Sequence, residues 1–392
     1  MYQILTKNTI SQKGLSKLPE KDFLISEDLA DPDGILVRSA DLHGYAMQDS
    51  LLAIARAGAG TNNIPVEDCS AKGIVVFNTP GANANAVKEL VIAALLLSSR
   101  KITEGAGWVR TLTDQPDLDK KVEAGKKNFV GPEIAGKTLG VVGLGAIGVL
   151  VANAALSLGM DVIGYDPYLS VRSAWQISGQ VRLAASLEEL VSQSDYVTLH
   201  VPLNSATEGT VNQALLAKFK NGARLINLAR GGLVVSRDVA DALKAGILSR
   251  YVTDFADGML MGMEAVITFP HLGASTPESE ENCAVMAALQ LRDYLEFGNI
   301  RNSVNYPNCE APYTPGKARV TILHRNIPNM VGSITTLFAK EGLNIDNMIN
   351  KSRGEYAYTI IDFDSIGDKR DAFLADLSQV NGIIKARIIR EQ

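Results

Sequence analysis

The sequence predicts an α/β protein made of two parallel-sheet domains, followed by a small domain with a βαββαβ order of elements. The chain has 392 residues, which is too long for one ordinary hydrophobic core. Short continuous apolar runs alternate with helix-period segments from Gly34 to Gly273, a pattern typical of parallel strands that are covered on both faces. After Lys317 the character of the chain changes, and strand-like runs outnumber helical ones.

The first predicted domain covers residues 1–92 and is completed by residues 289–306. Its strands are short apolar runs that each end in a turn containing Gly, Asn or Pro. These runs are 34–37, 51–54 and 74–77. An apolar helix follows at 88–100, and the charged, irregular segment 105–132 predicts a partly exposed linker.

The second predicted domain covers residues 93–288. Its predicted strands are mostly continuous apolar runs, namely 138–142, 161–165, 196–199, 225–227 and 251–253. A long helix at 278–297 returns the chain to the first domain. Pro and Asn then accumulate over 302–315, which predicts a linker.

The third predicted domain covers residues 317–392. Its elements follow the order βαββαβ, with strands at 320–323, 344–349, 356–363 and 384–389 and helices at 331–340 and 369–377. Gly342 is placed to end the first of these helices as a C-terminal cap.

Composition narrows the class of protein. The net charge of −5 gives no attraction to nucleic acid or to an anionic membrane. The three cysteines lie far apart without a CxxC pair, which argues against a disulfide framework or a zinc site. The N-terminus lacks the apolar core of a signal peptide, and the longest apolar run, Leu90–Leu97, is too short to span a bilayer. We therefore expect a soluble cytoplasmic protein with a small-molecule substrate.

A glycine-rich turn opens the second predicted domain. Gly143, Gly145 and Gly148 have the GxGxxG spacing between an apolar strand and an apolar helix, which is the context that a dinucleotide fingerprint requires. The first glycine allows the tight turn, the second lets the backbone approach a pyrophosphate, and the third allows close packing of helix and strand. The amides at the start of the helix, around Ala146 and Ile147, then face the anion.

An acidic residue ends the next predicted strand. Asp166 lies 18 positions after Gly148, close to the spacing of about 20 that the fingerprint expects. Its carboxylate can accept hydrogen bonds from the adenosine ribose and would repel a 2′-phosphate. Pro167 and Tyr168 follow it, with no Arg or Lys. The pattern therefore favours NAD over NADP as the cofactor.

Two residues are candidates for hydride-transfer chemistry on a 2-keto acid. Such a reaction needs a cation at the carbonyl and carboxylate and an acid for the developing alkoxide. Arg230 follows the predicted strand 225–227, at the edge of a parallel sheet where ligands bind. His271 lies in the turn-rich stretch Pro270–Thr276. By composition alone, either residue is explained as well by a solvated turn.

The chain from Gly34 to Ala288 resembles the D-isomer-specific 2-hydroxyacid dehydrogenases. Four pieces carry this resemblance in the right order: the Gly143–Gly148 fingerprint with Asp166, Leu199–Leu203, Asn227–Gly232 and Pro270–Gly273. The resemblance implies a doubly wound Rossmann cofactor domain inserted in a smaller flavodoxin-like substrate domain. It also implies that Arg230 binds and polarises the keto acid and that His271 is the acid and base.

The same resemblance implies further contacts with the cofactor. They fall on His200, Val201, Pro202, Ala229, Asp254 and Gly273, with Asp254 on the nicotinamide-ribose side. His200 is expected to act through its backbone position rather than as a second acid.

One position departs from the family pattern. Family members carry a Glu a few residues after the Asp that corresponds to Asp254, and this Glu pairs with the catalytic His. This chain has Gly258 at the position of the Glu. Three alternatives are open. Asp257 substitutes from one residue earlier, Glu264 reaches in from further along, or His271 has no carboxylate partner. We expect Asp257 to be the partner.

Two pieces of the first domain point to the substrate. Small residues at Gly58, Ala59 and Gly60 expose backbone amides that can hold a carboxylate, as the resemblance also implies. Arg38 and Ser39 are similar to a piece that directs an Arg toward the phosphate in the phosphoglycerate-oxidising branch of the family. This branch implies 3-phosphoglycerate as substrate. Another D-2-hydroxyacid dehydrogenase, acting on glyoxylate, hydroxypyruvate or D-lactate, and a non-catalytic NAD sensor are the alternatives.

The third predicted domain resembles an ACT domain, a small-ligand sensor. In serine-regulated relatives a His and two Asn hold serine, and these fall on His324, Asn326 and Asn344. The resemblance implies L-serine or another amino acid as a regulatory ligand and a homo-oligomer, either a dimer or a tetramer. A domain that serves only for assembly is the alternative.

Overall fold

The structure is a computed structural model of the chain, and it describes residues 1–313, 316–364 and 366–389. Thr314 and Pro315 of the predicted linker lie outside the described residues, as do Arg390–Gln392 at the end of the third predicted domain. Among the described residues, no helix is both long enough and apolar enough to cross a bilayer.

The chain forms two compact units. The first comprises Met1–Ala82 and Glu280–Gln392, and the second comprises Asn83–Ser279. The predicted domain limits at 92/93 and 288/289 fall inside two helices, α3 (Ala84–Ser99) and α11 (Pro277–Phe297). The first unit therefore contains both the predicted substrate lobe and the predicted C-terminal domain.

A five-stranded sheet forms the centre of the first lobe. All of its pairings are parallel, and its strand order is β2-β1-β3-β4-β5, the flavodoxin-like order that was predicted. The strands are β1 (Tyr2–Lys7), β2 (Phe23–Ser26), β3 (Gly34–Val37), β4 (Ala53–Arg56) and β5 (Val75–Phe77). The sequence did not predict β1 and β2. In β1 only Ile4, Leu5 and Thr6 are buried, so the apolar run is shorter than the strand.

Helices cover this sheet on both faces. They are α1 (Gln12–Leu15), α2 (Val66–Ala71) and α11. Gly14 of α1 and Ala284 of α11 let these two helices pack closely. A Cβ atom at Gly14 would lie only 2.6 Å from the Cβ of Ala284. Leu291 and Leu295 of α11 share one buried core with Ile4 of β1. The predicted return of the chain to the first lobe through this helix is thus confirmed.

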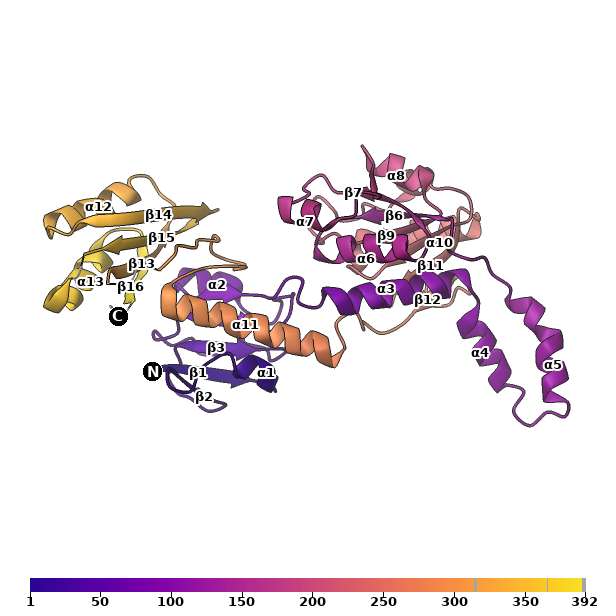
Figure 1. Ribbon diagram of the computed structural model, residues 1–392, viewed down its shortest axis with the longest axis horizontal. Coiled ribbons are helices and arrows are strands. Elements are labelled where there is room, and N and C mark those ends of the chain that lie inside the picture. The colour runs from indigo at the N-terminus through magenta and orange to yellow at the C-terminus, as the bar shows by residue number, and fades with distance from the viewer. Residues whose placement is uncertain (314–315, 365, 390–392) are drawn as a thin grey trace. The chain divides into compact units, whose positions relative to one another are not determined.

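The second unit contains a seven-stranded sheet whose pairings are again all parallel. The strand order is β12-β11-β10-β9-β6-β7-β8. The strands are β6 (Thr138–Val142), β7 (Asp161–Tyr165), β8 (Arg182–Leu183), β9 (Tyr196–Leu199), β10 (Ala223–Asn227), β11 (Leu248–Thr253) and β12 (Val266–Thr268). Because the first strand, β6, lies in the middle and the order runs outward in both directions, this is the predicted doubly wound sheet (Figure 1).

Two separate apolar layers cover the two faces of this sheet. One contains side chains of α3 and α6 (Ala146–Ser157), such as Val91 and Val149. The other contains side chains of α8 (Leu187–Gln193), α9 (Gln213–Leu216) and α10 (Ser236–Lys244).

The segment 105–132 was predicted as an irregular, partly exposed linker. It is exposed as predicted but mostly helical, so the irregular part of the prediction was wrong. It forms α4 (Ile102–Arg110), α5 (Leu118–Gly125) and a 3₁₀ turn at Lys126–Phe129. None of the residues of α4 and α5 is buried, and Figure 1 shows both helices standing away from the sheet. A contact between the rings of Trp108 and Phe129 (5.3 Å between centroids) joins α4 to the 3₁₀ turn that follows α5. Because these helices are exposed and rich in charged residues, their helical periodicity was not recognised in the sequence.

The C-terminal domain has the predicted βαββαβ order. Its elements are β13 (Ala318–Arg325), α12 (Met330–Lys340), β14 (Ile345–Arg353), β15 (Tyr356–Phe363), α13 (Arg370–Gln379) and β16 (Ile383–Ile389). The strands form an antiparallel sheet in the order β14-β15-β13-β16, with both helices packed on one face. Gly342 has a φ of +68°, as its predicted capping position requires.

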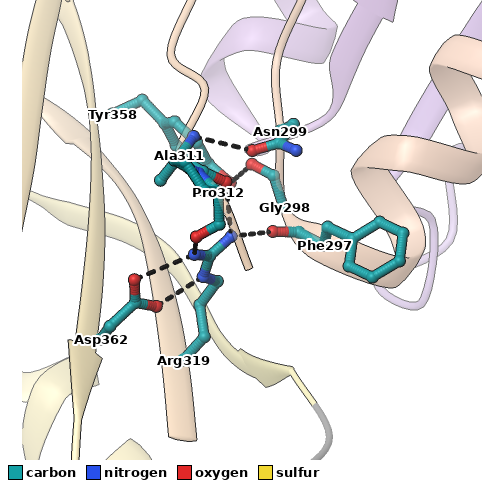
Figure 2. A network of polar contacts seen from close by, with 8 residues as sticks. All are labelled: Phe297, Gly298, Asn299, Ala311, Pro312, Arg319, Tyr358 and Asp362. Carbon is teal, nitrogen blue, oxygen red and sulfur yellow. Dashed lines mark hydrogen bonds and ion pairs between the residues drawn. The ribbon is translucent and has the colours of Figure 1, made fainter. Parts of the chain in front are cut away.

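The other face of this sheet packs against the first lobe around a buried ion pair. Arg319 is fully buried, and its guanidinium binds both carboxylate oxygens of Asp362 at 2.6 and 2.9 Å. Its remaining N–H groups donate to the carbonyl oxygens of Phe297, Ala311 and Pro312 (Figure 2). All five donors of the guanidinium therefore have acceptors, and two of these partners lie in the loop that follows α11.

We expect Asp362→Ala to lower the free energy of unfolding by about 3–5 kcal/mol, because the substitution leaves a buried guanidinium without its counter-charge. Urea denaturation measures this change. The matched control is Asp364→Ala, whose carboxylate is half exposed and pairs with Lys317, so it should cost about 1 kcal/mol or less. Equal unfolding midpoints for the two variants would contradict this account.

Candidate active site

The glycine-rich turn has the geometry of an anion-binding loop. Gly143 has a φ of +91°, and a Cβ there would lie 2.7 Å from the carbonyl oxygen of His200. A Cβ at Gly148 would lie 1.9 Å from the carbonyl oxygen of Gly143. At Gly145, the residue before α6, a Cβ would meet no atom within 4 Å, so the backbone there is open to a ligand. The helix begins at Ala146 and Ile147, whose amides face the turn without an acceptor of their own helix.

Asp166 is attached to this turn by its own carboxylate. One oxygen accepts a hydrogen bond from the amide of Leu144 (2.8 Å), and the other accepts one from the amide of Tyr168 (2.8 Å). These bonds hold the side chain beside the turn, although each carboxylate oxygen keeps a lone pair for a further donor.

The end of β9 packs against the same turn. The amide of His200 donates to the carbonyl of Val142 (2.7 Å), and the side chain of Val201 lies next to Gly143. The imidazole of His200 lies 3.0 Å from the hydroxyl of Thr198, and burial lowers the pKa of His200 to about 3. The lowered pKa favours the neutral imidazole. Pro202 accepts a hydrogen bond from Thr207, which closes the turn.

Arg230 lies just beyond the end of β10. The buried side chain of Asn227 accepts a hydrogen bond from the amide of Ala229 (3.2 Å) and donates one to the carbonyl of Arg230 (2.9 Å). Asn227 thereby fixes the turn that presents the arginine, a role that the sequence analysis did not assign to it. The guanidinium of Arg230 is exposed and donates to the carbonyl of Ala229.

His271 has a carboxylate partner, and that partner is Asp254. The distance between His271 Nδ1 and Asp254 Oδ2 is 3.4 Å. Asp254 is 3% exposed, and neither of its side-chain oxygens has a hydrogen-bond donor among the described residues. Burial raises the pKa of Asp254, whereas the nearby charges of His271 and Arg230 act in the opposite direction. Arg230, Asp254 and His271 thus form one electrostatic group, with Gly273 next to Asp254 and the ring of Phe255 against His271.

The structure does not bring Asp257 to His271. Its carboxylate accepts hydrogen bonds from the hydroxyl of Ser236 (2.7 Å) and the amide of Met259 (2.8 Å), and these bonds lower the pKa of Asp257. Glu264 lies before β12 and His271 lies after it, so the two occupy opposite ends of that strand. Neither Asp257 nor Glu264 therefore takes the place of the family's Glu beside His271.

In the first lobe, two arginines lie at neighbouring strand ends. Arg38 follows β3, and Arg56 ends β4, where it pairs in register with Val37. The Nε of Arg56 donates to the carbonyl of Arg38 (3.1 Å). The guanidinium of Arg38 forms an ion pair with Glu280 of α11, in which both side chains are nearly half exposed. Arg56 was missed by the sequence analysis because nothing in its local sequence distinguishes it from an ordinary strand-end residue.

The loop after β4 presents backbone amides. The carbonyl of Gly58 accepts from the amide of Thr79 (3.1 Å), and that of Ala59 accepts from the side chain of Asn78 (2.6 Å). Within the described part of the chain, the amides of Ala59 and Gly60 have no acceptor. The amide of Ser39, in contrast, is already bound by the side chain of Asn8.

The three residues predicted to hold a regulatory ligand lie at two ends of the C-terminal domain. His324 is buried, and its ring nitrogens contact the carbonyl of Arg325 (2.8 Å) and the hydroxyl of Thr359 (2.9 Å). Asn326, two residues later, donates to the carbonyl of Gly354. Asn344 precedes β14 at the opposite end of the sheet. The positions on β15 that pair with His324 and Ile345, namely Ala357 and Phe363, are six residues apart, or about 20 Å of strand.

The second unit has the features that a dinucleotide requires. The open backbone at Gly145 leaves room for an anion, and the carboxylate of Asp166 is held beside the turn at the end of β7. The unsatisfied, buried carboxylate of Asp254 is an acceptor for a ligand donor. No group of three or more His, Cys, Asp or Glu side chains in the described ranges is placed to hold a metal ion.

Comparison with known proteins identifies the family. The model of the D-isomer specific 2-hydroxyacid dehydrogenase NAD binding domain matches residues 92–273. A D-3-phosphoglycerate dehydrogenase of Haemophilus influenzae is 32% identical over 353 residues, which cover 86% of this chain and 81% of that protein. This chain therefore belongs to the family of D-isomer specific 2-hydroxyacid dehydrogenases, and NAD is the cofactor of its second unit.

Other relatives are longer than this chain or share mainly its fold. A D-3-phosphoglycerate dehydrogenase of Methanocaldococcus jannaschii is 36% identical over 72% of this chain, and the chain spans about half of that protein (53%). The crystal structure of the TT0316 protein from Thermus thermophilus has a TM-score of 0.61 and 28% identity, covering 77% of this chain and 99% of its own. An NAD⁺-bound 3-phosphoglycerate dehydrogenase from Entamoeba histolytica has a TM-score of 0.58 and 24% identity, covering 78% and 98%, which is a likeness of fold.

Proposed function

We propose that the chain catalyses the NAD-dependent interconversion of D-3-phosphoglycerate and 3-phosphohydroxypyruvate, the first step of L-serine biosynthesis. The observation that carries the proposal is the cluster of Arg230, Asp254 and His271 at one edge of the NAD-binding sheet. Curated relatives of this chain bear the name D-3-phosphoglycerate dehydrogenase. The pair of arginines at the ends of β3 and β4 supports a substrate with a phosphate.

The anionic ends of the substrate have separate partners in this proposal. Arg38 and Arg56 bind the phosphate, because a guanidinium matches phosphate oxygens with paired donors. The ion pair between Arg38 and Glu280 is largely solvated, so exchanging the carboxylate for a phosphate costs little free energy. The unoccupied amides of Ala59 and Gly60 bind the carboxylate.

Arg230 and His271 act on the reacting carbon. Arg230 polarises the C2 carbonyl and stabilises the negative charge that develops on its oxygen. NAD, held by the glycine turn and Asp166, would supply the hydride acceptor for C2, and NADH the hydride donor in the reverse direction. His271 removes the proton of the C2 hydroxyl during oxidation and returns it to the oxygen during reduction.

Asp254 positions His271 for this proton transfer. If Nδ1 of the imidazole faces Asp254, Nε2 is the nitrogen that is available to the substrate. The carboxylate also stabilises the imidazolium that forms when the ring takes the proton. A contact between Asp254 and the nicotinamide side of NAD remains part of the proposal, because its second oxygen has no protein donor among the described residues.

Two alternatives differ from this proposal in specific features. A dehydrogenase for glyoxylate, hydroxypyruvate or D-lactate would have no use for the arginine pair at β3 and β4. A non-catalytic NAD sensor would have no need for a buried carboxylate facing an exposed histidine, since an unsatisfied buried acid is costly.

We expect the protein to reduce 3-phosphohydroxypyruvate with NADH far more efficiently than glyoxylate. Arg56→Gln should lower kcat/KM for the phosphorylated substrate by about tenfold or more, the usual effect of losing a charged hydrogen bond. The value for glyoxylate, which has no phosphate, should stay near that of the wild type. Lys21→Gln, which removes an exposed cation from the same lobe, is the control. Equal loss on both substrates would exclude the phosphate role, and no turnover of either would favour the sensor.

Asp254→Asn should move the alkaline limb of the pH–rate profile for keto-acid reduction to lower pH by about one unit or more. The reason is that reduction requires a protonated imidazole, which the negative carboxylate favours and a neutral amide does not. Asp257→Asn is the matched control, since Asp257 is bound to Ser236 and should leave the profile in place. A profile that shifts with Asp257→Asn and not with Asp254→Asn would reverse our assignment.

We also infer that L-serine, or a closely related amino acid, binds between the C-terminal domains of two copies of the chain. Asn326 and Asn344 of one chain are separated by most of the length of the sheet, so one small amino acid cannot contact both. It can contact both positions only if one copy of the chain supplies Asn326 and a second copy supplies Asn344. This supports a homo-oligomer, a dimer or a tetramer. The buried His324 then serves to hold the loop of Asn326 through its bond to the carbonyl of Arg325.

L-Serine should bind and lower the activity of the wild type, and Asn326→Ala and Asn344→Ala should each relieve this inhibition without loss of basal turnover. A coupling of about 1–3 kcal/mol, or about 5–150-fold, is typical of such effects. Calorimetric titration paired with initial rates makes the measurement, with Gln379→Ala on the exposed side of α13 as the control. Absence of binding at millimolar serine would rule out the serine assignment.

A further inference from the structure

A cavity of about 590 Å³ lies between the C-terminal domain and the first lobe, within the first unit. One wall is the end of β14, Lys351–Arg353, and the other is the loop Asn302–Asn308 together with Asn78 and Pro80 after β5. It is widely open to solvent rather than enclosed, and its volume is enough to receive a small polar metabolite. It is lined by none of the residues to which the proposed reaction or the proposed serine site has been assigned.

The charge of this cavity is one-sided. Lys351 and Arg353 are two residues apart on one strand, so their side chains point to the same face, about 7 Å apart. None of the described residues that line the cavity is acidic. Lys351 has no ion-pair partner in the described part of the chain, and Arg353 uses one N–H for the carbonyl of Ser303 (2.7 Å). Most of the donor capacity of both cations is therefore available.

Neutral donors complete the lining. Asn302 has a left-handed φ of +58°, and its amide donates to the side-chain oxygen of Asn308 (2.9 Å). This bond uses the side-chain oxygen of Asn308 and leaves its NH₂ group available as a donor. Two cations with amide donors and no carboxylate suit an anion with more than one negative charge.

The far wall of the cavity is hydrogen-bonded to the proposed substrate loop. Asn78 takes part in bonds on both sides. Its side chain donates to the carbonyl of Ala59 (2.6 Å), and its backbone amide donates to the carbonyl of Asn302 (3.3 Å). Gln290 of α11 donates to the carbonyl of Asn78 (3.0 Å). A ligand that orders Asn302 and Asn308 therefore acts, through one residue, on the loop of Ala59 and Gly60.

We propose that this cavity is a binding site for a small polyanion, a phosphorylated or polycarboxylic metabolite, and that its occupancy changes the activity of the enzyme. Lys351 and Arg353 bind the charged groups, and the side-chain NH₂ group of Asn308 binds a remaining oxygen. The effect on activity rests on the proposed function of the loop Gly58–Gly60, whereas binding itself does not.

Calorimetric titration with citrate and, separately, with inorganic phosphate tests the binding. The wild type should bind at least one probe, and Lys351→Gln/Arg353→Gln should weaken that binding by about tenfold or more. Tighter binding of citrate would point to a polycarboxylate, and tighter binding of phosphate to a phosphate ester. Lys340→Gln/Lys369→Gln removes two cations from the helical side of the same domain and is the control. Lys351→Gln alone, which breaks no described ion pair or hydrogen bond, should give an intermediate loss with an unchanged unfolding midpoint.

The anion could also bind at the arginine pair of the first lobe, and a second measurement separates the two sites. Crystals soaked in tungstate should show anomalous density beside Lys351 and Arg353 that persists in Arg56→Gln. Initial rates with and without the bound probe should differ in the wild type and agree in the Lys351→Gln/Arg353→Gln variant, whose basal turnover is retained.

The proposal is overturned if affinity is the same in the wild type and the double variant, if the control loses binding equally, or if tungstate occupies only the arginine pair. Binding with no change of rate in an active enzyme would overturn the coupling. An enzyme that binds the probe in the cavity and turns over no hydroxy acid would instead count against the proposed function.

Discussion

The candidate active site depends on one constraint, the hydrogen-bond register of parallel strands, which brings their carboxyl ends to a common edge. Val142 pairs with Leu199, and Asn227 pairs with Thr253, so the residues that follow these strands must lie near one another. The glycine turn, the His200 turn, Arg230 and Asp254 all come directly after such strand ends. The same holds in the first lobe, where Val37 and Arg56 are paired. Four sequence pieces that look unrelated along the chain are therefore adjacent because β-sheet geometry leaves no other arrangement.

Within this edge, the burial of Asp254 sets the electrostatics. A carboxylate that is 3% exposed and has no hydrogen-bond donor among the described residues is unfavourable unless cations lie close to it. His271 and Arg230 supply that charge, and burial makes the attraction stronger than it would be in water. In the proposed reduction of a keto acid, Arg230 and His271 carry positive charge. The buried carboxylate of Asp254 favours the positively charged form of both. The stability of the site and the chemistry we propose for it have the same physical cause.

The sequence predicted the doubly wound sheet closely because continuous apolar runs are a strong local signal, and β6, β7 and β9 begin and end where the pattern placed them. It did not predict α4 and α5, which bury no residue and carry their few apolar side chains, such as Ile102 and Val109, exposed among charged ones. Nor did it identify the partner of His271, although both residues were named. Whether Asp254 or Asp257 faces the histidine depends on the directions of side chains on β11 and after β12. Those directions follow from sheet register and from the competing hydroxyl of Ser236, neither of which local spacing encodes.

The C-terminal domain is attached to the last turn of α11 in the first lobe, which gives the proposed serine site a physical connection to that lobe. Its cations bind backbone carbonyls: Arg319 that of Phe297, and Arg387 those of Tyr294 and Leu295, all in the last turn of α11. These carbonyls lie at the C-terminal end of the helix, where cations are favoured by the helix dipole. The carbonyl of Tyr294 also accepts the amide of Gly298, and that of Leu295 also accepts the hydroxyl of Tyr2. The other end of α11 carries Glu280, which is paired with Arg38. Because a helix moves as a rigid body, a ligand that shifts the sheet of the C-terminal domain by an ångström or two must shift α11 with it or break these bonds. The consequence is felt at Arg38, where we propose that the phosphate of the substrate binds.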